Sequence, residues 1–168
     1  MPDLLDRVLA SREWAGMWQH CDVGRHIVEV VADSAAPPEA VWEVITDIAR
    51  WKDWGPFSNT YLGRDGDPPN GIGAIRVYVV GPFRTQEEVV GFDAPGHFAY
   101  RVVSGFPARD YRADVTLDLR PGGGTSVRWR AEFDGKPRGT GWLLRIALIP
   151  FLGYLARKTG QVAAAPRP

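Results

Sequence analysis

The sequence has almost no cysteine: Cys21 is the only one among 168 residues. A single cysteine excludes a disulfide within the chain and a metal cluster held by thiolates. The three histidines, His20, His26 and His97, lack the spacing of ligands on one helix or strand, so we predict no metal site. A chain without disulfides is expected in a reducing compartment, and we predict a cytoplasmic protein.

An excess of charge of either sign is also missing. The 20 Lys and Arg residues balance the 20 Asp and Glu residues. Electrostatic attraction to a polyanion is therefore weak, and we predict no nucleic-acid partner. The glycine run over 122–124 is not followed by the Lys-Ser/Thr of a phosphate-binding loop, so it predicts a hairpin turn, and we expect no cofactor.

Apolar runs long enough for a membrane span are absent as well. The densest apolar stretch, residues 142–155, is shorter than the roughly 20 residues that a helix needs to cross a bilayer. It predicts a helix that is buried or that lies at an interface. The overall length suits one domain with a core large enough to fold without covalent staples.

The N-terminal residues 3–18 carry apolar side chains at helical spacing. These positions are Leu4, Leu5, Val8, Leu9, Trp14, Met17 and Trp18. We therefore predict a helical extension over residues 1–25, a main domain over 26–160 and a frayed tail over 161–168. The extension either docks on the domain or offers a surface to a partner or a membrane.

Alternation of apolar and polar residues predicts a sheet. After a first strand over 26–36 and a helix that begins at Pro37-Pro38, apolar residues recur with a period of two. Turns rich in glycine and proline divide this region into strands 57–63, 72–80, 83–92, 97–105, 109–119 and 125–134. Such short connections predict an antiparallel meander with one apolar face. A helix over 139–165, which Pro150 is expected to kink or split, is left to cover that face.

Four groups of short motifs follow one another along the main domain. They are Pro38-x-x-x-Trp42-x-x-x-Thr46-Asp47 with Trp51-x-x-Trp54, Gly71-x-Gly73-x-x-Arg76, Glu87-Glu88-Val89-Val90-x-x-Asp93, and Gly123-Gly124-Thr125-x-Val127-x-Trp129. In this order they resemble the START/Bet v 1-like superfamily, most closely its polyketide cyclase/dehydrase branch (SRPBCC proteins). The resemblance implies an α+β helix-grip fold, with a curved seven-stranded antiparallel sheet wrapped around a long C-terminal helix. It also implies a cavity between sheet and helix for an apolar ligand.

The resemblance indicates which side chains face that cavity. In the strand over 72–80 it favours the face of Arg76, and in the next strand it places Glu87 rather than Glu88 inside. Together with the alternation in the later strands, it implies ten ligand contacts: Arg76, Tyr78, Val80, Phe83, Glu87, Tyr100, Val102, Tyr111, Ala113 and Trp129. Glu87, Arg76 and Tyr111 are the candidates for a catalytic role. Tryptophans at helical or alternate spacing are expected to fill the core.

Two interpretations of Arg76 and Glu87 stay open. Burial of either charge alone is costly, so pairing or protonation is expected. In the functional interpretation, Arg76 holds a carbonyl or carboxylate of the ligand, and burial raises the pKa of Glu87 so that it acts as an acid or base. In the structural interpretation, the two form an ion pair at the solvent face of the sheet.

Two turns resemble the lids of hormone-binding relatives. They span residues 81–84 and 104–109, and each carries one phenylalanine, Phe83 or Phe106, beside glycine and proline. Such turns suit a mouth that closes over an apolar ligand. The alternative is a pair of ordinary hairpin turns with one exposed aromatic side chain each.

We therefore expect a protein that binds a small hydrophobic ligand, such as a lipid, isoprenoid or polyketide, as a monomer or homodimer. The same cavity would serve a polyketide cyclase or aromatase-like dehydratase, in which Arg76 or a tyrosine stabilises an enolate oxygen and Glu87 moves a proton. A third interpretation is a lipid-handling protein with a peripheral membrane contact, because cationic residues flank the apolar stretch over 142–155.

Overall fold

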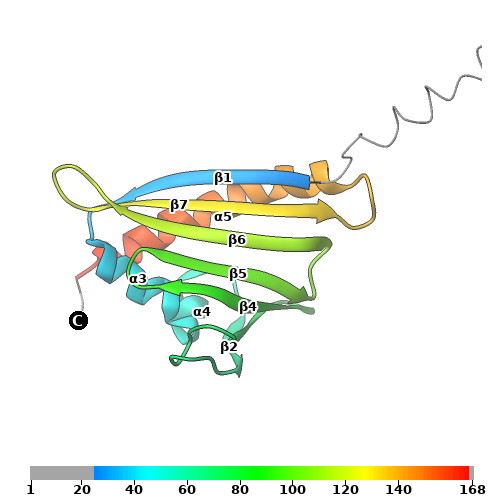
Figure 1. The fold of residues 1–168 in the computed structure, drawn as a ribbon, viewed down its shortest axis with the longest axis horizontal. Coiled ribbons are helices and arrows are strands. Elements are labelled where there is room, and N and C mark those ends of the chain that lie inside the picture. Colours follow the sequence, from blue (N-terminus) through cyan, green and yellow to red (C-terminus); the bar gives the residue numbers. More distant parts are fainter. Residues whose placement is uncertain (1–24, 167–168) are drawn as a thin grey trace, which may run out of the picture.

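The computed structural model describes residues 25–166. The elements in chain order are β1 (Arg25–Ser34), α3 (Pro38–Thr46), η1 (Ile48–Arg50), α4 (Trp51–Trp54), β2 (Asn59–Arg64), β3 (Ile75–Val80), β4 (Phe83–Asp93), β5 (His97–Ser104), β6 (Ala108–Leu119), β7 (Thr125–Gly135) and α5 (Gly141–Ala164). The strands form one seven-stranded antiparallel sheet in the order β1-β7-β6-β5-β4-β3-β2, and α5 packs on one face of it (Figure 1). The predicted meander and the helix-grip fold are thereby confirmed.

The strands lie close to their predicted positions. The bounds of β4 to β7 differ from the prediction by at most one residue at either end. β3 begins later than predicted because the preceding residues form a turn around Asp65. The Asp65 carboxylate accepts hydrogen bonds from the main-chain N–H groups of Asn70 and Gly66, which lower the pKa of this carboxyl below its usual value. Residues 72–74, which were predicted as the start of this strand, therefore belong to the turn region instead.

The C-terminal helix is longer and more regular than expected. Pro150 lies inside α5 on its exposed side, and the helix continues through it, so the proline does not split the helix. The predicted domain end at residue 160 falls within α5, and residues 161–164, expected in a frayed tail, are helical. The extension predicted over residues 1–25 lies outside the described residues, except for Arg25 at the start of β1.

The hydrophobic core lies between the sheet and the helices. Trp42 packs edge-on against Phe92, with ring centroids 4.9 Å apart. Trp42, Trp51 and Trp129 are buried, as their spacing predicted, and Trp54 is half-buried. Rings of this size bury enough apolar surface to hold α3 and α4 on the sheet.

Bulges bend the sheet around α5. The register of β6 against β7 shifts between Arg109 and Arg112, where Asp110 has a φ of 50°. A second shift, between Val89 and Gly91, interrupts the pairing of β4 with β5. An extra residue on one strand bends that strand and increases its twist. The sheet thereby gains an inner face wide enough to leave a hollow beside the helix.

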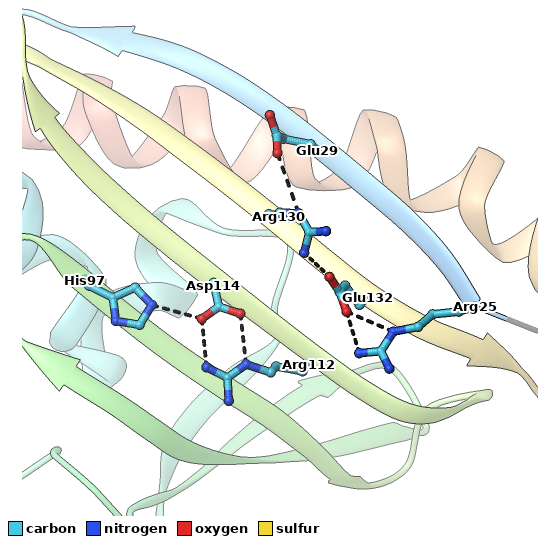
Figure 2. A network of polar contacts seen from close by, with 7 residues as sticks. All are labelled: Arg25, Glu29, His97, Arg112, Asp114, Arg130 and Glu132. Atoms are coloured by element: carbon cyan, nitrogen blue, oxygen red, sulfur yellow. Dashed lines mark hydrogen bonds and ion pairs between the residues drawn. The ribbon is translucent and has the colours of Figure 1, made fainter.

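Charged side chains cover the other face of the sheet (Figure 2). His97 Nε2 lies 2.9 Å from Asp114 Oδ1, and Arg112 donates to both oxygens of Asp114. The Arg112 guanidinium, with His97, holds the pKa of the Asp114 carboxyl below its usual value. A second cluster on β1 and β7 comprises Arg25, Glu29, Arg130 and Glu132. These ion pairs make the outer face polar, and their side chains do not line the hollow on the inner face.

Candidate functional site

A cavity of about 150 Å³ lies between the inner face of the sheet and α5. It is lined by Trp51, Phe57, Tyr78, Val80, Phe83, Thr85, Glu87, Tyr100, Val102, Phe106, Tyr111, Leu148, Phe151 and Leu155. Most of this lining is aromatic or aliphatic, which is typical of a site for an apolar ligand. An apolar cavity of about 150 Å³ holds a benzene-sized molecule, so a larger ligand would extend through the mouth.

The mouth of the cavity is apolar too. Phe83 is 72% exposed although it lines the cavity, and Val80 beside it is 46% exposed. On the opposite rim, Phe151 of α5 is 37% exposed. Large apolar side chains that line a cavity and also meet solvent mark its opening.

Four polar side chains cross the floor of the cavity from β3 to β6. They are Tyr78, Glu87, Tyr100 and Tyr111, one from each strand. The strand register brings them onto one face. Glu87 pairs with Arg76, which lies two residues before Tyr78. Tyr100 pairs with Val89, which lies two residues after Glu87. Residues two apart on a strand share a face, so all four point inward.

A hydrogen bond from Trp129 holds the Tyr100 side chain in place. Trp129 Nε1 donates a hydrogen bond of 3.1 Å to the Tyr100 hydroxyl oxygen. Because that oxygen accepts this bond, the Tyr100 O–H is free to donate, and it does so to the hydroxyl of Tyr111. Trp129 therefore acts on the site through Tyr100.

Burial keeps these four groups protonated. It raises the pKa of Glu87 to about 8, although the Arg76 guanidinium and the Tyr78 hydroxyl act in the opposite direction. Burial also raises the pKa of Tyr78, Tyr100 and Tyr111 above the usual range of a phenol. At neutral pH the row is therefore uncharged, and its members also hydrogen-bond in pairs, Tyr78 with Glu87 and Tyr100 with Tyr111. Neutral hydroxyl and carboxyl groups of this kind suit an uncharged ligand oxygen with a lone pair.

Arg76 lies beside the cavity and does not line it. It is fully buried, and its two terminal nitrogens donate to the carbonyl oxygens of Ile45, at 2.9 Å, and Thr46, at 2.8 Å. Its guanidinium carbon lies 4.5 Å from the centre of the Phe98 ring. Cations favour the carbonyl end of a helix and the face of an aromatic ring, so Arg76 is held as a cap on α3.

This geometry bears on both the functional and the structural interpretation of Arg76 and Glu87. An ion pair at the solvent face is wrong, because Arg76 is buried and Glu87 faces the cavity. The carboxylate at the outer face belongs to Glu88, which pairs with Arg101 at 2.7 Å. Since main-chain carbonyls occupy the terminal nitrogens of Arg76, we treat it as a positioning residue, and its contact with a ligand stays a prediction.

Seven of the ten expected contact residues line the cavity: Tyr78, Val80, Phe83, Glu87, Tyr100, Val102 and Tyr111. Arg76, Ala113 and Trp129 do not. Ala113 and Trp129 are buried on the same face of the sheet, and alternation alone gives no depth along a strand. Contact of these residues with a ligand stays a prediction.

Seven lining residues were not among the ten expected contacts: Trp51, Phe57, Thr85, Phe106, Leu148, Phe151 and Leu155. Thr85 shares the face of Phe83 and Glu87, so the alternation contains its signal. Phe106 is the aromatic residue of the second lid-like turn. The α5 residues carry no such signal, because their half of the helix is apolar on every side.

The two lid-like turns meet each other. Gly105 has a φ of +78°, and a Cβ atom there would lie 1.8 Å from the Arg84 carbonyl oxygen. The Thr85 hydroxyl donates to the Gly105 carbonyl oxygen at 3.1 Å. Only glycine allows this approach, which places Phe106 over the cavity and edge-on to Tyr111, at 5.3 Å between ring centroids.

Neither a metal centre nor a membrane span is found in residues 25–166. No three His, Cys, Asp or Glu side chains gather there as a metal ion would require. No helix in that range is both long and apolar enough to cross a bilayer.

Comparison with known proteins identifies a family and a fold. Residues 25–158 match the sequence profile of the family described as polyketide cyclase / dehydrase and lipid transport. That match covers most of the chain and agrees with the resemblance seen in the motifs. No curated protein matches the chain in sequence.

Solved structures match at low sequence identity. A START superfamily protein from Mycobacterium smegmatis gives a TM-score of 0.71 at 12% identity, over 82% of this chain and 97% of that one. A truncated norcoclaurine synthase from Thalictrum flavum gives 0.69 at 14% identity, over 85% and 96%. XoxI from Bacillus cereus gives 0.62 at 17% identity, over 81% and 94%. These likenesses establish the fold and no shared activity.

Proposed function

Because the chain belongs to the polyketide cyclase/dehydrase and lipid transport family, we propose that it binds a small hydrophobic ligand between the sheet and α5. Members of this family typically bind ligands in a hydrophobic cavity. The observation that carries the proposal is the lining of the cavity, in which aromatic and aliphatic walls surround one row of uncharged proton donors.

The lining also limits the chemistry of the ligand. No cationic side chain is among the described residues that line the cavity, so nothing there neutralises a carboxylate or phosphate. Glu87 and the tyrosines present donors to an oxygen that accepts hydrogen bonds. An uncharged lipid, isoprenoid or polyketide with a carbonyl or hydroxyl group fits this arrangement best.

A substitution that fills the cavity tests this proposal. Val102 lines the cavity, and its neighbour Val103 is exposed on the outer side of β5. We expect Val102→Trp to weaken binding of the uncharged probe N-phenyl-1-naphthylamine at least tenfold, because the indole takes the place of the ligand. The measurement is a fluorescence titration, with Val103→Trp as the matched control. Equal affinity of both variants and the wild type would contradict the assignment of the cavity.

Mass spectrometry of organic extracts would then name the ligand class. We expect a compound that co-purifies with the wild type and with Val103→Trp but is missing from Val102→Trp. A charged compound bound equally by all three proteins would contradict the chemistry proposed above.

A second candidate function is a dehydratase that acts on a folded polyketide. The observation that favours it is the Glu87 carboxyl, whose pKa of about 8 lets it hold a proton at neutral pH and give it to a departing hydroxyl. The hydroxyl leaves as water, the proton on the carbon next to the carbonyl passes to solvent, and the electron pair of that C–H bond forms the new double bond. Solvent then returns a proton to the Glu87 carboxylate. We expect turnover of a β-hydroxyketone thioester to fall above about pH 8 and to drop roughly 100-fold or more in Glu87→Gln. Glu88→Gln, on the same strand but the opposite face, is the control. Absence of turnover in the wild type would leave ligand binding as the function.

A further inference from the structure

The N-terminal half of α5 is apolar on the side that faces away from the protein. Leu148, Leu152 and Leu155 bury one side of the helix. The opposite side exposes Trp142, Leu143, Ile146 and Ile149, with Trp142 at 55% and Ile146 at 59% exposure. A helix that packs only on its own domain carries polar residues there. We call these four residues the exposed α5 face.

The charged side chains of the segment that carries this face have one sign. The segment from Gly135 to Pro166 contains five cationic residues and no Asp or Glu. They are Lys136, Arg138, Arg145, Arg157 and Lys158. The Arg157 guanidinium lies close to Gly153, one turn back along α5. The chain as a whole is neutral, which makes this local excess a feature of the helix.

The exposed face continues to the mouth of the cavity. Leu143, Ala147 and Phe151 follow one another at intervals of four residues and therefore share one side of α5. Phe151 both lines the cavity and meets solvent, and Phe83 stands exposed on the opposite rim. The mouth of the cavity and the exposed α5 face are thus connected along this side of the helix.

We propose that the exposed α5 face docks on an anionic lipid bilayer. A helix surface with tryptophan and aliphatic residues between cations is typical of elements that lie in the membrane interface. Each Lys or Arg near an anionic surface adds attraction, and the apolar side chains enter the acyl region. Transfer of the ligand between bilayer and cavity rests on the proposed function, but docking itself does not.

Two other occupants compete for this face. One is a second copy of the chain, and the other is the segment over residues 1–24, whose apolar side chains are spaced as in a helix. A second copy packed through the same face would bring these five cations close to five more, which like-charge repulsion opposes, whereas an anionic bilayer attracts them. This favours the bilayer, and both alternatives are outcomes of the test below.

The test is flotation of the full chain with lipid vesicles. We expect binding to phosphatidylcholine vesicles with 30% phosphatidylglycerol, and at least tenfold weaker binding to phosphatidylcholine alone. The double variant Trp142→Ser/Ile146→Ser should lose at least tenfold in affinity, and Lys136→Glu/Arg138→Glu should lose a similar factor on anionic vesicles only. Leu119→Ser, which removes an exposed leucine of the sheet, is the control and should bind like the wild type.

Three results would overturn docking. The first is no binding to anionic vesicles, and the second is binding that Trp142→Ser/Ile146→Ser leaves unchanged. The third is rapid formation of an intramolecular disulfide between Cys21 and a cysteine introduced as Ile146→Cys, which would assign the face to residues 1–24. If no vesicles are bound, sedimentation velocity shows whether a second copy covers the face instead. A dimer that Trp142→Ser abolishes would identify the second copy as the occupant. The titration with N-phenyl-1-naphthylamine needs no vesicles, so it tests ligand binding in the cavity independently of docking on a membrane.

Discussion

Raising the pH from about 5 to about 8 is expected to destabilise the wild-type protein relative to a Glu87→Gln variant by as much as about 4 kcal/mol. The sign follows from proton binding. Between these pH values the folded protein keeps the Glu87 proton, because burial raises the pKa of that carboxyl to about 8. The unfolded chain has released it, since an ordinary glutamate titrates near pH 4.5. The contribution of Glu87 to the free energy of unfolding is therefore greatest at low pH and falls as the pH rises through about 8.

Urea denaturation at several pH values measures this effect. Glu87→Gln keeps a neutral side chain of the same shape, so it removes the titration and leaves the packing. Glu88→Gln, which changes the neighbouring glutamate on the outer face, should follow the wild-type curve closely, because exposed ion pairs contribute little. Parallel curves for the wild type and Glu87→Gln would show that Glu87 is ionised in the folded protein, and the row of neutral donors would then be wrong.

The fold could be predicted because its signals are local. Alternation along β6 and β7 gave both their bounds and the face that each side chain occupies. The turns at 81–82 and 121–124 divide the strands, and short turns leave an antiparallel meander as the simplest topology. Residues two apart on a strand share a face. Alternation did not show which face of β3 or β4 is the inner one, and it was the family resemblance that placed Tyr78 and Glu87 toward α5.

The site could be predicted only in part, since its remaining features depend on distances between elements. Nothing in the alternation shows that the guanidinium of Arg76 reaches the end of α3, some 30 residues earlier in the chain. For the same reason, Trp129 was expected at the cavity but lies beneath Tyr100. The contacts from α5 were missed because an apolar helix without a polar side gives no indication of which residues face inward.

Loss of Arg76 is expected to be the most damaging change for the fold itself. Arg76→Met keeps a long apolar side chain but leaves the Ile45 and Thr46 carbonyls without their charged donor. A hydrogen bond to a charged group contributes about 1.5–3 kcal/mol, so the loss of two should lower the free energy of unfolding by about 3–6 kcal/mol. Arg101→Met, which removes an exposed arginine on β5, is the control and should cost no more than about 1 kcal/mol.

The same substitution should also change the cavity, and this separates a positioning role from simple stability. The Ile45 carbonyl that accepts from Arg76 also accepts from Trp51 Nε1, at 3.1 Å, and Trp51 lines the cavity. Without Arg76, Trp51 loses part of its support, and the pKa of Glu87 rises further because the nearby positive charge is gone. We expect carboxyl NMR of Arg76→Met to show the Glu87 titration at higher pH and the naphthylamine probe to bind more weakly, whereas Arg76→Lys should keep the Glu87 pKa near its wild-type value. If Arg76→Met were destabilised but left both the Glu87 titration and probe affinity unchanged, Arg76 would be a cap of α3 with no influence on the site.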